Sequence, residues 1–107
     1  MSEHISLCNT TDVEVDKPLA VDTEGFPPLA VYLVEEEFFV TDNICTHGMA
    51  LLTEGYQEEG EIECPFHGGA FDIKTGEAIS FPCQTPIKSY PVTIIDGKVC
   101  IPADMKE

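Results

Sequence analysis

Basic residues are scarce in this chain of 107 residues. It contains five lysines, no arginine and 20 acidic residues, so its formal net charge is −15. A protein that binds nucleic acid needs Lys and Arg to neutralise phosphates, so this composition excludes that class of partner. The same sign of charge excludes binding to an anionic membrane surface.

Long hydrophobic runs are also missing. The longest is Leu29–Val34, six residues, whereas a transmembrane helix needs roughly 20. The first residues, Met1–His4, contain neither a basic region nor an apolar stretch, so we expect no signal peptide and a cytoplasmic location. Because 43% of the residues are hydrophobic, we expect a folded protein, with residues 1–107 forming a single domain.

Helical periodicity is hard to find, and short runs rich in β-forming residues, separated by Gly, Pro, Asp and Asn, replace it. The strongest hairpin signal is Asp96-Gly97, because a type I′ turn requires positive φ at both central residues. Short strands at this spacing favour an antiparallel sandwich or small barrel. Strands are predicted near Ile5–Leu7, Leu19–Val21, Leu29–Val34, Phe38–Thr41, Glu61–Glu63, Phe71–Ile73, Ala78–Ser80, Val92–Ile95 and Lys98–Ile101.

Signatures of catalysis are absent. There is no Gly-x-Gly-x-x-Gly loop, so neither nicotinamide nor flavin binding is expected. The five cysteines are odd in number, and a reducing compartment disfavours disulfides. Cys8, Cys83 and Cys100 have no histidine near them in sequence and are interpreted as small buried apolar side chains. Of the three histidines, His4 is expected to be solvated.

The remaining cysteines and histidines form two mixed pairs. The first is Cys45-Thr-His47, and the second is Cys64-Pro-Phe-His67, sixteen residues further on. A structural zinc site usually takes two cysteines from one element and two histidines from another. Mixed pairs are better suited to a binuclear cluster, with both cysteines on one iron and both histidines on the other, as in a Rieske [2Fe–2S] centre. A structural zinc site in an interaction module is the alternative.

Cys-x-His-x₁₆-Cys-x-x-His resembles the Rieske iron–sulfur motif, and the chain around it resembles the small Rieske-type ferredoxins of bacterial aromatic-ring dioxygenase systems. The likeness covers most of the chain, including Thr41–Gly48, Glu61–Ile73, Phe81–Cys83 and Pro86–Val92. It implies an all-β fold: a small antiparallel β-sandwich with an inserted cluster-binding subdomain of two loops, at about residues 43–72.

The resemblance also implies the cofactor and its surroundings. One Rieske-type [2Fe–2S] cluster would be held by Cys45, His47, Cys64 and His67. Backbone near Gly48, Gly68 and Gly69 would approach the cluster sulfurs, since these residues lack a Cβ. Pro82 matches a proline-bearing loop that covers the far side of the cluster.

Departures from the related quinol-oxidising proteins bear on the redox potential. Ala50 and Phe66 occupy the positions of two cysteines that form a disulfide in those proteins. Gly69 and Phe71 occupy the positions of a Ser and a Tyr that donate hydrogen bonds to cluster sulfur. Such bonds stabilise the reduced cluster. Without them, the potential is expected toward the low end of the Rieske range, roughly −150 to +300 mV.

The implied function is that of a soluble electron carrier and not an enzyme. It would pass single electrons from an NAD(P)H-dependent flavoprotein ferredoxin reductase to the terminal Rieske oxygenase of an aromatic-ring dioxygenase. The complexes would be transient and steered by the acidic charge. The alternative with the same cofactor is a small Rieske subunit of a nitrite reductase or another oxidoreductase.

Overall fold

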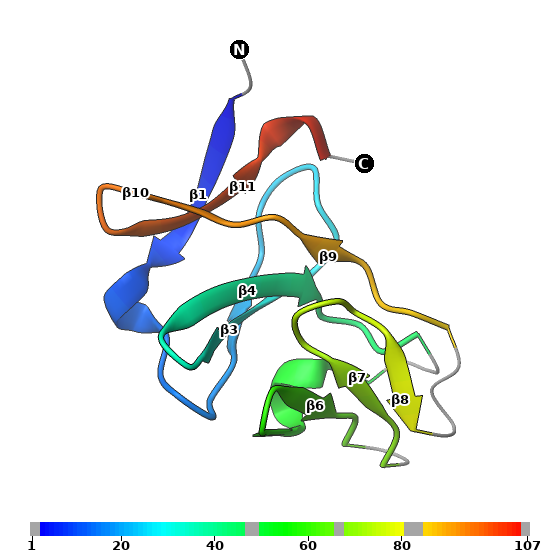
Figure 1. Cartoon of the computed structure of the whole chain (residues 1–107). Coiled ribbons are helices and arrows are strands. Elements are labelled where there is room, and N and C mark those ends of the chain that lie inside the picture. Colours follow the sequence, from blue (N-terminus) through cyan, green and yellow to red (C-terminus); the bar gives the residue numbers. More distant parts are fainter. Residues whose placement is uncertain (1–2, 47–49, 66–67, 81–84, 106–107) are drawn as a thin grey trace.

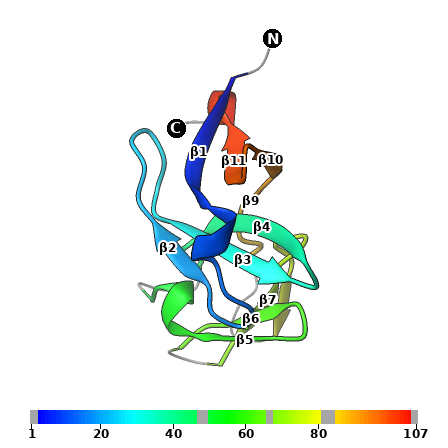
Figure 2. The same ribbon diagram turned by 90° about the vertical axis from the view of Figure 1, so that its left-hand side faces the viewer.

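The computed structural model describes residues 3–46, 50–65, 68–80 and 85–105. These residues form three antiparallel sheets and three short 3₁₀ helices, with no α-helix among them. The sheets follow one another from the top to the bottom of the molecule in Figure 1, and Figure 2 shows the same order from the side. The all-β antiparallel fold predicted from the sequence is confirmed.

The upper sheet has the strand order β1–β11–β10, with β1 at His4–Asn9, β10 at Thr93–Ile95 and β11 at Lys98–Pro102. The hairpin between β10 and β11 turns at Asp96 and Gly97, whose φ angles are 50° and 74°. Both values are positive, as a type I′ turn requires, so the predicted Asp96-Gly97 hairpin is confirmed.

The middle sheet has the order β2–β3–β4–β9, and its strand β3 is covered on both faces. Leu29 and Val31 of β3 belong to an upper core, whereas Ala30 and Tyr32 belong to a lower core. A strand that is buried on both faces has an uninterrupted apolar sequence, which explains the sequence of β3. The strands are β2 (Leu19–Val21), β3 (Leu29–Val34), β4 (Glu37–Asp42) and β9 (Ser89–Tyr90).

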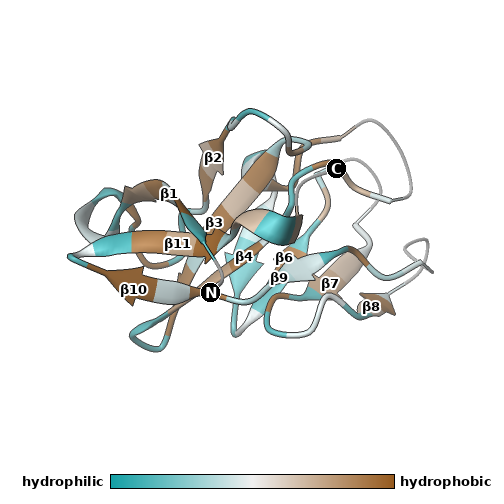
Figure 3. Ribbon diagram, turned by 90° about the horizontal axis from the view of Figure 1, so that it is seen from above, coloured by the Kyte–Doolittle hydropathy of each residue, from teal (hydrophilic) through white to brown (hydrophobic). Residues whose placement is uncertain are grey.

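Two apolar clusters fill the spaces on either side of this middle sheet, and Figure 3 shows the hydrophobic residues concentrated on the strands. The upper core consists of Val13, Leu29, Val31, Val40, Tyr90, Val99 and Ile101. The lower core consists of Ala30, Tyr32, Val34, Cys45, Ala50, Leu52, Ile62, Cys64, Phe71, Ile73 and Ile87.

The lower sheet has the order β5–β6–β7–β8. Gln57, Ile62 and Phe71 form one row across three of its strands, and all three are buried. Their neighbours in β5 and β6 are exposed. The sheet therefore has one face on the lower core and one toward solvent. The strands are β5 (Tyr56–Glu58), β6 (Glu61–Glu63), β7 (Ala70–Asp72) and β8 (Ala78–Ser80).

The predicted set of strands needs three corrections. β5 was not predicted, because its sequence Tyr-Gln-Glu contains no apolar alternation and only Gln57 faces inward. β9 was not predicted, because it has two residues and ends just before Pro91. The strand expected at Phe71–Ile73 lies one residue earlier, at Ala70–Asp72. Ile73 is nevertheless buried.

Short 3₁₀ helices complete the described structure: η1 (Thr10–Asp12), η2 (Leu52–Glu54) and η3 (Ala103–Met105). The segment before β1 and the start of η3 lie together at the upper end, where the backbone N–H of Ala103 donates to the carbonyl of Glu3 at 2.9 Å (Figure 2). No helix in residues 3–46, 50–65, 68–80 or 85–105 is long and apolar enough to span a bilayer.

Candidate metal centre

The first predicted ligand segment begins just after the end of β4. The backbone N–H of Cys45 donates to the carbonyl of Ala50 at 2.9 Å, and an antiparallel bridge pairs Ile44 with Leu51. These contacts close the segment at its base, like the stem of a hairpin. Cys45 is 2% exposed. His47 and Gly48 lie outside the described residues.

The second predicted ligand segment follows β6 and has a related closure. The backbone N–H of Cys64 donates to the carbonyl of Gly69 at 2.6 Å, and Cys64 is also 2% exposed. Gly68 has φ 73°, in the left-handed region that glycine adopts without steric cost. His67, and Pro82 of the later predicted loop, lie outside the described residues.

The fold brings the two cysteines into one place. Cys45 and Cys64 both belong to the lower core, where Leu52, Ile62 and Phe71 accompany them. An apolar site of this kind supplies soft sulfur donors while excluding water, and sulfur donors are what iron–sulfur clusters bind through. The described part of the predicted donor set therefore fits one iron of a [2Fe–2S] cluster. We call this cysteine-bound iron the inner iron and the histidine-bound one the outer iron.

Two further contacts support the two ligand segments from outside. A Cβ on Gly55, just before β5, would collide with the carbonyl of Glu63 and lie 3.2 Å from Cδ of Pro65. Only glycine allows this close approach to the chain on both sides of Cys64. The hydroxyl of Thr46 donates to the carbonyl of Thr85 at 2.7 Å, which links the first ligand segment to a distant part of the chain.

Two buried polar residues near the site escaped sequence reasoning. Asn43 is 1% exposed and hydrogen-bonded to Thr53. Gln57 is 9% exposed, and its Nε2 donates to the carbonyl of Leu33 at 2.9 Å, which joins the lower sheet to the middle one. In sequence, both read as ordinary polar residues of turns, because burial of a single side chain leaves no periodic pattern.

The solvent face of the lower sheet is acidic. Tyr56 pairs with Glu63, and Glu58 with Glu61, so three carboxylates and one phenol project from the same side of two strands. An exposed ion pair joins Lys17 to Glu14 at 3.6 Å and involves none of these three carboxylates. A shallow hollow on this face is lined by Tyr56, Glu58, Glu59, Glu61, Glu63 and Ala70.

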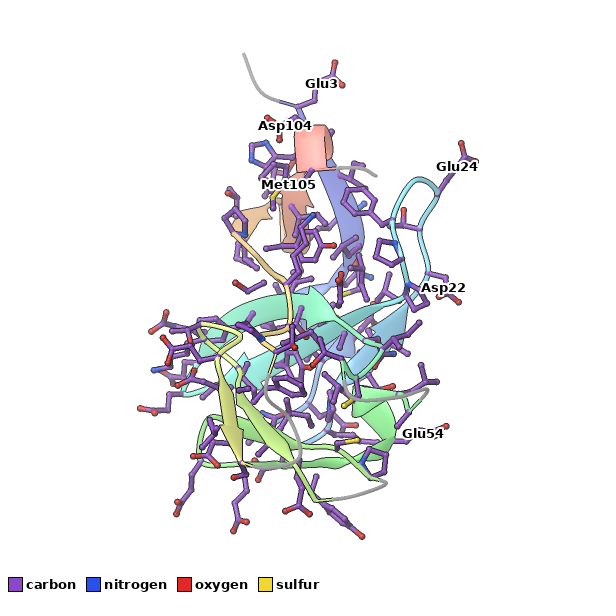
Figure 4. The ribbon with its side chains drawn as sticks, turned by 90° about the vertical axis from the view of Figure 1, so that its right-hand side faces the viewer. Glu3, Asp22, Glu24, Glu54, Asp104 and Met105 are labelled. Carbon is purple, nitrogen blue, oxygen red and sulfur yellow. The ribbon has the colours of Figure 1, made fainter. Side chains whose placement is uncertain are left out.

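Acidic side chains also project from the rest of the molecule. Figure 4 shows Glu54 of η2 pointing outward beside the lower sheet and Asp22 and Glu24 on the loop between β2 and β3. Glu3 and Asp104 lie at the upper end in the same view. The negative charge is therefore spread over the surface, and it reaches the lower end that holds Cys45 and Cys64.

Among the described residues, Cys8 and Tyr32 have shifted pKa values. Burial, with smaller contributions from Asp12 and Cys100, raises the pKa of Cys8 from 9.0 to about 11. Burial also raises the pKa of Tyr32, against the opposing effect of its hydrogen bond to Thr41. Neither group is therefore suited to exchange protons near neutral pH. Cys100 is buried, as predicted, Cys8 is half-buried, and Cys83 lies outside the described residues.

Comparison with known proteins places this fold and site in a family. The family model for the Rieske [2Fe–2S] domain matches residues 3–91. The ferredoxin component of the p-cumate 2,3-dioxygenase system of Pseudomonas putida is 42% identical over 102 residues, which are 94% of this chain and 86% of that protein. The chain belongs to the Rieske [2Fe–2S] domain family.

Solved ferredoxin structures agree with this assignment. The Sphingomonas yanoikuyae B1 ferredoxin superimposes with a TM-score of 0.92 and 60% identity, over 94% of this chain and 98% of that one. The complex of reduced oxygenase and oxidized ferredoxin in carbazole 1,9a-dioxygenase contains a chain with a TM-score of 0.88 and 38% identity, over 97% of this chain and 95% of that one. The cofactor is one Rieske-type [2Fe–2S] cluster, not a structural zinc ion.

Proposed function

We propose that this protein is the ferredoxin of an aromatic-ring dioxygenase system and that Cys45, His47, Cys64 and His67 hold its cluster. The burial of Cys45 and Cys64 in one apolar core, on two similarly closed segments, carries the assignment of the thiolates. When bound, a Rieske-type cluster supplies a one-electron redox couple. The imidazoles of His47 and His67 would complete the donor set at the outer iron.

The protein's own residues contribute binding and shielding. Cys45 and Cys64 supply the negative charge that the inner iron requires, and the lower core around them excludes water. Phe71, fully buried in that core, offers no hydroxyl to sulfur. This supports the expectation of a low potential. Gly48, Gly68, Gly69 and Pro82 are proposed to surround the cluster at a second level, in a subdomain at about residues 43–72 of one domain spanning 1–107.

The partners proposed are an NAD(P)H-dependent flavoprotein reductase, which donates electrons, and a terminal Rieske oxygenase, which accepts them. The acidic face of the lower sheet would meet basic patches on both, giving short-lived complexes that weaken as salt rises. We propose a cytoplasmic location, where such a reductase finds its nicotinamide substrate. The role of an electron carrier is favoured over that of a nitrite reductase subunit, because the relative and structures described above are ferredoxins.

A reconstitution experiment tests this function. Purified protein should contain about two irons and two acid-labile sulfides and give the EPR spectrum of a Rieske centre after reduction. Adding it to a flavoprotein reductase, NAD(P)H and a terminal oxygenase should allow hydroxylation of an aromatic substrate. A Rieske spectrum without electron transfer to any such oxygenase would retain the cofactor and reject the partners. A colourless protein with one zinc ion would reject both.

A further inference from the structure

Asn43 occupies the junction between the middle sheet and the first ligand segment. It directly follows β4, and its backbone N–H donates to the carbonyl of Pro28 at 2.8 Å, one residue before β3. Two residues later comes Cys45. Asn43 is therefore fixed to the sheet on one side and begins the segment that holds a metal ligand on the other.

The side chain and the backbone of Asn43 both form hydrogen bonds to residues 50–53, the return arm of that segment. Its carbonyl accepts the backbone N–H of Leu52 at 2.7 Å. Its Oδ1 accepts the backbone N–H of Thr53 at 2.9 Å, and its Nδ2 donates to the Thr53 hydroxyl at 3.1 Å. Together with the bond from Cys45 to Ala50, these contacts form successive links between the outgoing and returning arms.

The preference for asparagine follows from this geometry. The neutral amide offers an acceptor for the Thr53 N–H and a donor for the Thr53 hydroxyl at the same place. Aspartate would accept from both groups but bring a negative charge into a buried position, and alanine has no hydrogen-bonding group. Asn43 is 1% exposed, so water has no access to its end of the contact and cannot restore a lost partner.

The return arm in turn places a wall of the site. Leu52, one of the two residues of the arm that Asn43 holds by hydrogen bonds, is fully buried in the lower core with Cys45 and Cys64. If the arm shifts, Leu52 disturbs the core that it shares with both cysteines, because a packed core has little free space to absorb the displacement. The side chain of Asn43 therefore influences the sulfur donors through the packing of this core.

We infer that Asn43 is a positioning residue for the metal centre: its amide fixes the return arm at Thr53 and so sets the geometry of the segment that carries Cys45 and His47. This inference rests on the proposed ligand set. It adds a residue that belongs to neither ligand pair and predicts that the cluster environment depends on an amide two residues before Cys45.

A set of four variants tests the inference. Asn43→Ala removes both side-chain bonds. Thr53→Val removes only the hydroxyl partner with little change of shape, and Thr53→Ser keeps it. Val99→Ala, in the upper core, is the matched control that weakens folding away from the site. For each purified, cluster-loaded variant we would measure thermal unfolding, the EPR g values of the reduced protein and the rate at which the visible absorbance is lost in the presence of a chelator.

The expected result is a graded effect confined to the first two variants. Asn43→Ala should lose its cluster about tenfold faster than wild type, which corresponds to roughly 1.4 kcal/mol, and its g values should shift. Thr53→Val should lose its cluster at a rate between those of wild type and Asn43→Ala, and Thr53→Ser should match wild type. Val99→Ala should lower the unfolding temperature but leave the g values unchanged.

Two outcomes would overturn the inference. The first is an Asn43→Ala variant that has wild-type g values and loses its cluster at the same rate as Val99→Ala, when the two variants have equal unfolding temperatures. The second, decisive even if Asn43→Ala does not load a cluster, is identical behaviour of Thr53→Val and Thr53→Ser. Failure of the proposed function appears separately, as the absence of a Rieske spectrum in the wild-type protein.

Discussion

Cys45 and Cys64 occupy equivalent positions in two segments of different sequence: each donates its backbone N–H to the carbonyl of the fifth residue after it, and each is 2% exposed in the lower core. A histidine follows the first cysteine by two residues and the second by three. The same closure therefore brings the thiol of each segment into the lower core, as the proposed pair of thiolate ligands requires.

Replacing either histidine by cysteine should convert the Rieske centre toward an all-thiolate cluster. His47→Cys or His67→Cys should lower the midpoint potential toward the roughly −400 mV of plant-type ferredoxins, because thiolate donates more electron density than neutral imidazole. The midpoint and the EPR spectrum measure this. His4→Cys, at an exposed position of β1, is the control and should change neither. Unchanged spectra in both ligand variants would contradict the assignment.

Adding a hydroxyl near the cysteines should raise the potential. Phe71→Tyr places an O–H within the lower core, where donation to sulfur would stabilise the reduced, more negative cluster. Gly69→Ser should act in the same direction. Phe38→Tyr, which makes the same chemical change beside the upper core, is the control. The tuning argument fails if a crystal structure shows the new bond to sulfur while the voltammetric midpoint stays unchanged.

Gly55 should be more sensitive to alanine than Gly60, the glycine between β5 and β6. A Cβ there meets the Glu63 carbonyl, so Gly55→Ala should cost about 2–3 kcal/mol of unfolding free energy and reduce cluster loading. Gly60→Ala is the matched control: its Cβ meets nothing within 4 Å, but φ is 80°, so it should cost only about 1 kcal/mol. Denaturant unfolding measures both. Equal costs in unfolding free energy would contradict this prediction, because they would show that the backbone around Cys64 shifts to accommodate the added Cβ.

The acidic face of the lower sheet should matter more for association than equal charge elsewhere. Replacing Glu58, Glu61 and Glu63 by glutamine should slow reduction by the flavoprotein reductase about tenfold at low salt and flatten its salt dependence. The control replaces Glu3, Glu24 and Asp104 by the corresponding amides, which changes the net charge equally. Stopped-flow absorbance measures the rates. Equal slowing by both triple variants would indicate a general charge effect and no local docking face.

Much of the fold was predictable because its signals are local. The run Leu29–Val34 predicts a strand, and Asp96-Gly97 predicts a tight hairpin; both predictions are confirmed. The strand at Tyr56–Glu58 was not predictable, since its residues take the extended form by pairing with Glu61–Glu63 and not by their own pattern. The predicted ligands His47 and His67 rest on spacing and family likeness, and they stay predictions.

By itself, the sequence determined the charge, the number of candidate ligands and their spacing, because these are properties of residue type and order. It was enough to exclude nucleic acid as a partner and to indicate a binuclear cluster. Only the tertiary structure decided that Cys45 and Cys64 share one dry core, that the chain passes too close to Gly55 for a side chain, and that Asn43 closes the first ligand segment. Burial and contact between distant residues arise from packing, so no local pattern reveals them.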